Sequence, residues 1–179
     1  MHWSEFSTDP NATIAKQAIH KHLLSIREIK KFNYMLWLLD KVKDKSCLDI
    51  GAVEHDLSYT EKDTWKHKQL AASASHIVGV DVLKEYAEAL QKRGFDIRYC
   101  DATSEEYLGE KFDTVVLGDV IEHVNNPVDL IRFAKRHLNP GGEIIAKTPN
   151  PYYVDHVKKC AKNRDFVSLD HMAWYTPTM

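Results

Sequence analysis

The sequence has few cysteines and no long apolar run. Cys47, Cys100 and Cys160 are far apart and odd in number, which excludes a disulfide framework and favours reduced thiols. No apolar stretch approaches the ~20 residues of a membrane span. The N-terminus also lacks the basic region and apolar core of a signal peptide. We therefore expect a cytoplasmic protein with no membrane span.

An excess of charge of one sign is also lacking. The 179 residues include 24 Lys and Arg and 26 Asp and Glu, for a formal net charge of -2. This balance, without a basic stripe, gives no electrostatic attraction to nucleic acid. Ten histidines are present, but no pair has H-x-x-x-H spacing beside further ligands. We therefore predict no nucleic-acid partner and no metal site.

Apolar runs that alternate with helical patterns predict an α/β fold. Such an alternation is typical of a mostly parallel, Rossmann-like sheet with helices on both faces. We predict an N-terminal helical segment, residues 1–46, packed on a core of residues 47–179. Strands are expected at 46–51, 75–82, 96–102, 112–120 and 143–151, and helices at 12–44, 65–74, 83–94, 125–142 and 152–162.

Acids stand at or near four consecutive strand ends of this predicted sheet. In parallel sheets, ligands bind outside these carboxyl ends. An acid after the second strand is placed to accept hydrogen bonds from ribose hydroxyls, and one after the third from an adenine amino group. A single such acid is more often a helix cap or a turn residue. Four in register favour an adenine nucleoside site: Asp49 with Gly51, Asp81 with Val82, Asp101 with Ala102, and Gly118 with Asp119.

Glycine is scarce in the loop after the first strand. The stretch "CLDIGAVEHD", residues 47–56, has one glycine and no G-x-G-x-x-G, and no P-loop occurs in the chain. Val53 is unsuited to a positive φ, and Glu54 would repel a pyrophosphate. S-adenosylmethionine has no phosphate and carries two cationic groups that acids favour. The loop therefore argues for S-adenosylmethionine rather than a dinucleotide.

Five segments together resemble the class I S-adenosylmethionine-dependent methyltransferases. They are "LDIG", "VGVD", "CDA", "KFDTVVLGDVIEHVNNPVDLI" and "LNPGGEIIAKTPN", within about residues 45–150. Within this family, the sequence is most similar to one branch. The fourth motif of that branch has an acid, two apolar residues and then Glu-His. The resemblance implies a Rossmann-like fold and a cofactor site formed by Asp49, Gly51, Ala52, Asp81, Val82, Asp101, Ala102, Gly118 and Asp119.

The sequence departs from this family in three places. Val53 and His55 stand where two further glycines are usual, and the stretch from Gly51 to Asp81 is longer than the ~20 residues of the related dinucleotide motif. The family's sheet has seven strands, whereas five are predicted here. "DHMAWYTPTM" resembles the segment before the last helix and two strands, so we expect the chain to end before them. The fifth strand would then have an exposed edge that invites pairing.

Methyl transfer from a sulfonium to a hydroxyl needs positioning and a general base. Asp119, His123 and His171 are the candidates, although a histidine at the position of His123 is more often a helix-start residue whose ring caps or packs. We predict a methyltransferase acting on a small polar metabolite, such as a sugar or a natural-product hydroxyl. The alternatives are a non-catalytic binding or scaffolding module of the same fold and a nicotinamide-dependent oxidoreductase.

Overall fold

The computed structural model describes residues 2–9, 11–27, 32–53, 55–162, 164, 168 and 170–176. The chain forms two compact units. One comprises Met1–Tyr34, Asn150–Val167 and Trp174–Met179, and the other comprises Met35–Pro149 and Ser168–Ala173. This division differs from the boundary at residue 46, which stays a prediction.

Among its described residues, the first unit contains helices and no strand. A 3-10 turn, η1 (Trp3–Glu5), precedes α1 (Thr13–Arg27), and α6 (Val154–Cys160) comes from the later part of the chain. The predicted helical segment 12–44 is divided between α1 and α2 (Tyr34–Val42), while residues 28–31 lie outside the described part.

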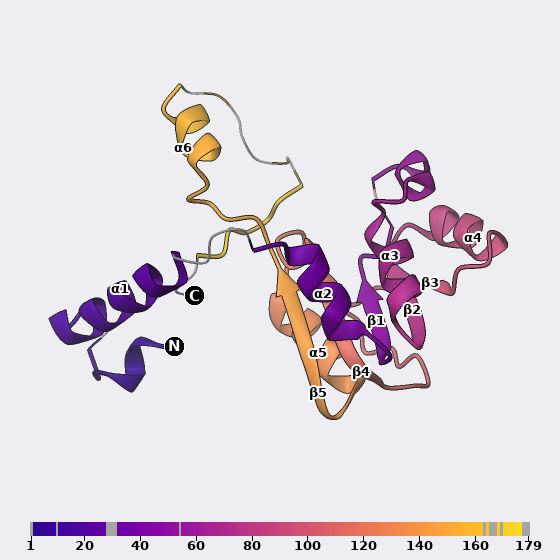
Figure 1. Cartoon of the computed structure of the whole chain (residues 1–179), viewed down its shortest axis with the longest axis horizontal. Helices are drawn as coiled ribbons and strands as arrows, with labels where there is room; N and C mark the ends of the chain where they lie inside the picture. Colours follow the sequence, from indigo (N-terminus) through magenta and orange to yellow (C-terminus); the bar gives the residue numbers. More distant parts are fainter. Residues whose placement is uncertain are drawn as a thin grey trace. The chain divides into compact units, whose positions relative to one another are not determined.

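The second unit is built on a five-stranded parallel sheet (Figure 1). Its strands are β1 (Ser46–Ile50), β2 (His76–Asp81), β3 (Ile97–Tyr99), β4 (Phe112–Gly118) and β5 (Leu138–Lys147). Their order is β3-β2-β1-β4-β5, and Leu48 of β1 pairs with Val78 of β2 and Val115 of β4. The mostly apolar residues on both faces of β1 and β4 explain this central placement, because a strand covered on both sides reads as a nearly continuous hydrophobic run. The predicted Rossmann-like α/β fold is confirmed.

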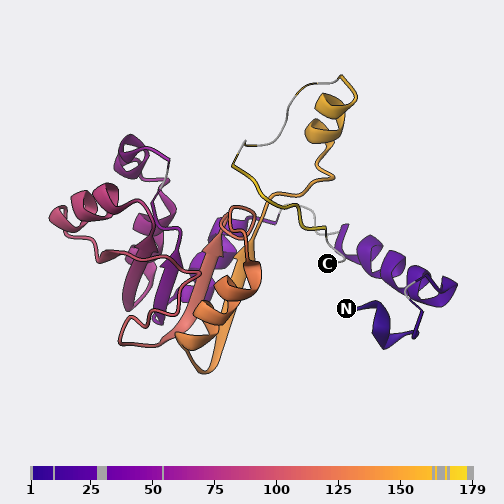
Figure 2. The same ribbon diagram turned by 180° about the vertical axis from the view of Figure 1, so that it is seen from behind.

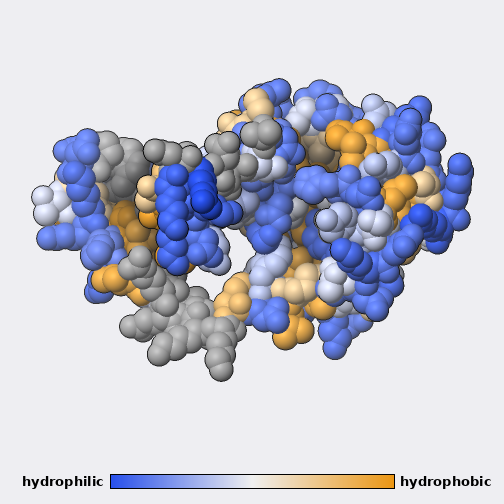
Figure 3. All heavy atoms as spheres, turned by 90° about the horizontal axis from the view of Figure 1, so that it is seen from above, coloured by the Kyte–Doolittle hydropathy of each residue, from blue (hydrophilic) through white to orange (hydrophobic). Residues whose placement is uncertain are grey.

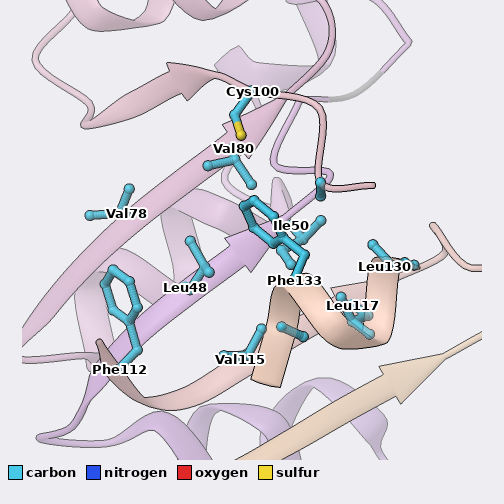
Figure 4. Packing of buried hydrophobic residues seen from close by; sticks show 12 residues of the cluster. Leu48, Ile50, Val78, Val80, Cys100, Phe112, Val115, Leu117, Leu130 and Phe133 are labelled. Carbon is cyan, nitrogen blue, oxygen red and sulfur yellow. The ribbon is translucent and has the colours of Figure 1, made fainter. Parts of the chain in front are cut away.

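Helices cover both faces of this sheet. α5 (Pro127–Arg136) packs on one face, where Phe133 points from α5 toward Ile50 of β1 (Figure 4). The other face is covered by α3 (Lys66–Ser73) and α4 (Lys84–Lys92), with the 3-10 turn η2 (Leu57–Glu61) before α3. α2 joins α3 there through a hydrogen bond from Ser73 to the Leu39 carbonyl. α2 and α5 lie on opposite sides of the sheet in both ribbon views (Figures 1 and 2).

The boundaries of α5 and β5 show one agreement and one error. The Asn126 side chain accepts a hydrogen bond from the Val128 amide and Pro127 begins the helix, close to the predicted start at residue 125. However, β5 begins at Leu138 rather than at residue 143, so the "NPGG" segment lies inside the strand. A register shift occurs between Phe112 and Thr114 of the neighbouring strand. Gly141, at φ +80°, provides the left-handed conformation that this irregular segment needs.

Hydrophilic side chains dominate the face of the molecule seen in Figure 3, with hydrophobic ones in separate groups. None of the helices in the described part of the chain has the length and apolar character to cross a membrane.

Candidate functional site

The carboxyl ends of all five strands meet at one edge of the sheet. Strand order reverses between β1 and β4, since β2 and β3 lie to one side of β1 and β5 lies beyond β4. In open α/β sheets this is where loops diverge and ligands bind. The predicted cofactor residues follow these strand ends, so the fold gathers them at one edge.

The loop after β1 directs its amides toward β2. The amides of Gly51 and Ala52 donate to the Val80 carbonyl at 3.0 and 3.2 Å, and the Val53 amide donates to Asp81 Oδ2 at 3.0 Å. These three amides therefore cannot also cradle a pyrophosphate. Glu54, predicted to repel such a group, lies outside the described residues.

Gly51 is required at this turn for two reasons. Its φ is +69°, a conformation that L side chains rarely adopt. A Cβ at this position would also lie 2.3 Å from Cγ2 of Val120. The loop after β1 thus passes directly against the loop after β4, which brings the two motifs together.

Asp81 is held at the end of β2 with its carboxylate in a fixed orientation. Besides the bond from Val53, its Oδ1 accepts the Leu83 amide at 3.0 Å. Burial raises the pKa of this carboxyl, although the backbone hydrogen bonds oppose the rise. A carboxylate has about four acceptor positions, so these two bonds leave capacity for ribose hydroxyls. Val82 beside it is 60% exposed and offers an apolar surface.

Asp49 is paired with two basic side chains. Its side chain is fully buried, with Oδ1 2.7 Å from Lys66 Nζ and Oδ2 3.0 Å from His67 Nδ1. Burial alone would raise the pKa of Asp49, but the Lys66 ammonium and the His67 hydrogen bond hold it below its usual range. Asp49 therefore positions Lys66 and His67 from beneath the site.

Lys66 lies over the ends of both central strands. Its Nζ donates to the Gly51 carbonyl at 3.3 Å. A Cβ on Gly118 would lie 2.7 Å from the same nitrogen. The Lys66 side chain is only 19% exposed, and its ammonium thus lies where β1 and β4 diverge.

Asp119 follows Gly118 in a strained backbone conformation. Its φ is +56°, which is uncommon for a residue with a side chain. Its amide donates to the Lys147 carbonyl, and its carboxylate pairs with the Lys147 ammonium. The turn after β4 is therefore tied to the end of β5. Beyond β3, exposed Asp101 accepts hydrogen bonds from the Thr103 amide and hydroxyl, next to buried Ala102.

The predicted residues His123 and His171 meet, although they are far apart in sequence. Their ring centroids are 4.7 Å apart in an edge-to-face arrangement. The amides of Met172 and Ala173 donate to the Glu122 carbonyl. These bonds hold the segment Ser168–Ala173 against the turn after β4. Asp119, the third candidate base, pairs with Lys147 instead.

Sequence reasoning missed the two basic residues that accompany Asp49. Lys66 and His67 begin α3, after an irregular stretch whose path no periodic pattern specifies. A lysine at the start of a helix has no distinctive signal, so only the fold could identify its partner.

The charged groups at this edge fit S-adenosylmethionine. Asp81 and the exposed apolar Val82 suit a ribose and an adenine. Lys66 suits a carboxylate, and Asp119 suits an ammonium. A pyrophosphate site needs free backbone amides in this loop, but the amides of Gly51, Ala52 and Val53 already donate to residues of β2.

Known proteins share parts of this sequence and its fold. A ubiquinone biosynthesis O-methyltransferase of Aeromonas salmonicida is 27% identical over 124 residues, 64% of this chain and 48% of that protein. An uncharacterized protein of Methanocaldococcus jannaschii is 37% identical over 68 residues, 38% of this chain and 33% of that protein. The chain thus spans between a third and a half of the length of these relatives.

A solved structure, that of Streptomyces venezuelae DesVI, superposes with a TM-score of 0.51 at 16% sequence identity. The match covers 74% of this chain and 57% of that one, which shows a shared fold. The family model described as "Methyltransferase domain" matches residues 21–178. The chain therefore belongs to the S-adenosylmethionine-dependent methyltransferase family.

Proposed function

We propose that this chain binds S-adenosylmethionine at the carboxyl edge of its sheet and transfers the methyl group to a hydroxyl of a small polar metabolite. The arrangement around Asp81 carries the proposal. Its buried carboxylate is oriented by the amides of Val53 and Leu83 and retains acceptor capacity. The family's cofactor supplies an electrophilic methyl group on a sulfonium.

In this proposal the side chains of the chain hold the two ends of the cofactor. Asp81 accepts hydrogen bonds from the ribose, and Val82 lies beside the adenine with Asp101 and Ala102. At the other end, Lys66 binds the carboxylate of the methionine moiety and Asp119 binds its ammonium. Asp49 keeps Lys66 in place rather than contacting the cofactor itself.

His123 and His171 are the residues proposed to face the acceptor. His123 follows the turn after β4, and His171, from the segment Ser168–Ala173, lies beside it. An imidazole can take the proton that an acceptor hydroxyl loses as its oxygen bonds to the methyl carbon. The assignment to the branch of the family whose fourth motif resembles "GDVIEH" remains a prediction. The small polar acceptor and the cytoplasmic location also remain predictions.

The first test is calorimetric titration of the chain with S-adenosylmethionine and S-adenosylhomocysteine. Asp81→Asn removes the charge but preserves the shape of the side chain. Loss of one or two charge-assisted hydrogen bonds, ~1.5–3 kcal/mol each, should weaken binding roughly tenfold to more than a hundredfold. Asp96→Ala is the matched control, because this acid precedes β3 at the opposite edge and pairs with Arg98.

Equal affinity of the wild type and Asp81→Asn would contradict the proposed site. Binding of a reduced nicotinamide dinucleotide, with none of S-adenosylhomocysteine, would favour the oxidoreductase alternative. Cofactor binding without S-adenosylhomocysteine production across a panel of hydroxylated acceptors would favour the binding-module alternative.

A further inference from the structure

Three side chains next to the turn after β4 form a group with metal-ligating chemistry. Glu122, His123 and His171 each offer one ligand atom, and these atoms all lie within 4.8 Å of one another. Among the described residues this is the group of histidine, cysteine and acidic side chains that meets the spacing for an ion. All three belong to the compact unit that contains the sheet.

Glu122 is the unusual member of this group. The residue is 1% exposed, and within the described part of the chain neither carboxylate oxygen has a hydrogen-bond partner. A buried carboxylate without partners costs several kcal/mol, and proteins normally avoid it by pairing, protonation or metal binding. The two nearby imidazoles, together with this carboxylate, could share one metal ion, which would compensate the cost of burial.

His123 also has the neighbour that metal-binding histidines usually have. Asp170 Oδ2 lies 3.3 Å from His123 Nδ1. A carboxylate there fixes the ring orientation and leaves Nε2 with the lone pair that a metal binds. The Ser168 hydroxyl donates a hydrogen bond to the other carboxylate oxygen of Asp170, which helps to hold this carboxylate in place.

The backbone sets the distance between the two parts of the group. Met172 N and Ala173 N donate to the Glu122 carbonyl at 2.7 and 3.2 Å. His171 is therefore held beside Glu122 by main-chain bonds that do not involve the ligand atoms. Bond lengths of ~2.0–2.2 Å place the ligand atoms of one ion about 3–4 Å apart, so metal binding would draw these atoms, now within 4.8 Å of one another, slightly closer together.

We propose that Glu122, His123 and His171 bind one divalent first-row transition-metal ion. Two imidazoles and one carboxylate suit Mn²⁺, Co²⁺ or Zn²⁺ better than Mg²⁺ or Ca²⁺, which favour oxygen ligands only. Three protein ligands leave at least one coordination position open.

The open position gives the site a role in acceptor recognition, and this second part rests on the proposed function. An acceptor hydroxyl, or two neighbouring hydroxyls, would complete the coordination. In the metal-bound form the two imidazoles are ligands rather than general bases, and the ion instead lowers the pKa of the coordinated hydroxyl. The acceptor class is then an oxygen nucleophile able to coordinate a metal, rather than an amine.

The test uses Co²⁺ alone, added to the chelator-treated chain and followed by visible absorption and calorimetry. We expect saturable binding of one equivalent, with at least tenfold weaker binding in Glu122→Gln and in His171→Ala. His76→Ala is the matched control, because His76 also lies beside a carboxylate, Glu110 Oε2 at 2.8 Å, but outside the group. It should bind Co²⁺ as the wild type does.

Thermal unfolding provides a second measurement that separates folding damage from loss of the site. Glu122→Gln removes an unpaired buried charge, so without metal this variant should be at least as stable as the wild type. Co²⁺ should raise the melting temperature of the wild type but not that of Glu122→Gln. S-adenosylhomocysteine binding, measured in chelator, reports the proposed cofactor site independently.

Two outcomes would overturn the metal site. One is the absence of saturable Co²⁺ binding by the wild type. The other is equal binding by the wild type and by both ligand variants, which would assign the ion to other histidines of this chain.

Discussion

At the scale of single residues, buried polar groups take their protonation states from their partners. His137 is fully buried, and the Leu108 amide donates to its Nε2 at 2.9 Å. Its Nδ1, 2.9 Å from the Phe133 carbonyl, must therefore carry the proton. This neutral tautomer satisfies both neighbours, and protonation of Nε2 would leave the Leu108 amide facing another donor.

Burial accordingly lowers the pKa of His137 below its ordinary value of 6.5, and the hydrogen bond to Phe133 opposes the change only in part. The unfolded chain binds the proton more readily than the folded one. The contribution of His137 to stability is therefore complete above about pH 6.5 and declines as pH falls through the lowered pKa.

We predict that the free energy of unfolding of the wild type decreases between pH 7.5 and 5, as measured by urea titration. His137→Gln should be less stable at pH 7.5 by about 1–3 kcal/mol, since one buried partner is lost, but should show a shallower decline. His20→Gln, at an exposed position of α1, serves as the control. A decline equally steep in His137→Gln would assign the pH dependence to other groups.

At the scale of elements, the loops at the strand ends depend on close approach. Gly51 and Gly94 both have positive φ, +69° and +92°, but a Cβ would meet Val120 only at Gly51. Gly94 has open space within 4 Å. The pair therefore separates backbone strain from steric overlap.

We predict that Gly94→Ala costs about 1–2 kcal/mol, the penalty of a left-handed residue with a Cβ. Gly51→Ala should cost a further ~1–3 kcal/mol, because the new methyl overlaps Val120 and pushes the two loops apart. Urea unfolding measures both costs. Binding of S-adenosylhomocysteine should weaken in Gly51→Ala and stay unchanged in Gly94→Ala, and comparable losses in the two variants would disprove the role of loop contact.

The strands were the part of the fold that the sequence specifies most directly. The apolar side chains of a run such as the one around Val116 are buried on both faces only when the strand lies between two layers of helices. The start of β5 was not predictable, because the "NPGG" segment contains the residues that usually end a helix. Its place in the sheet depends on pairing with β4, which is a non-local interaction.

The same distinction holds for the site. Asp81 and Gly51 could be proposed from the sequence because strand ends are local features of it. The pairing of Asp49 with Lys66 and the meeting of Glu122 with His171 join segments whose paths are irregular. A search for closely spaced histidines therefore overlooked a group whose members come from two separate segments.

At the scale of the whole molecule, cofactor binding is coupled to the stability of one unit. The residues proposed to hold S-adenosylmethionine all belong to Met35–Pro149. A ligand that binds only the folded state stabilises it by about 2.7 kcal/mol at a concentration of 100 times its Kd. For a domain of this size, 1 kcal/mol corresponds to roughly 2–4 °C in Tm.

S-adenosylhomocysteine at that concentration should therefore raise the Tm of the sheet-containing unit by roughly 5–10 °C. Trp65 reports this unit, because it is buried and its indole nitrogen donates to the Ala52 carbonyl at 3.0 Å. Its fluorescence should follow the shifted transition, and Asp81→Asn should lose about half of the shift or more at the same ligand concentration. Asp96→Ala should retain it. A full shift in Asp81→Asn would mean that the ligand binds elsewhere on the chain. The reason is that a ligand stabilises the folded state only through the site where it binds, so weakening that site must reduce the shift.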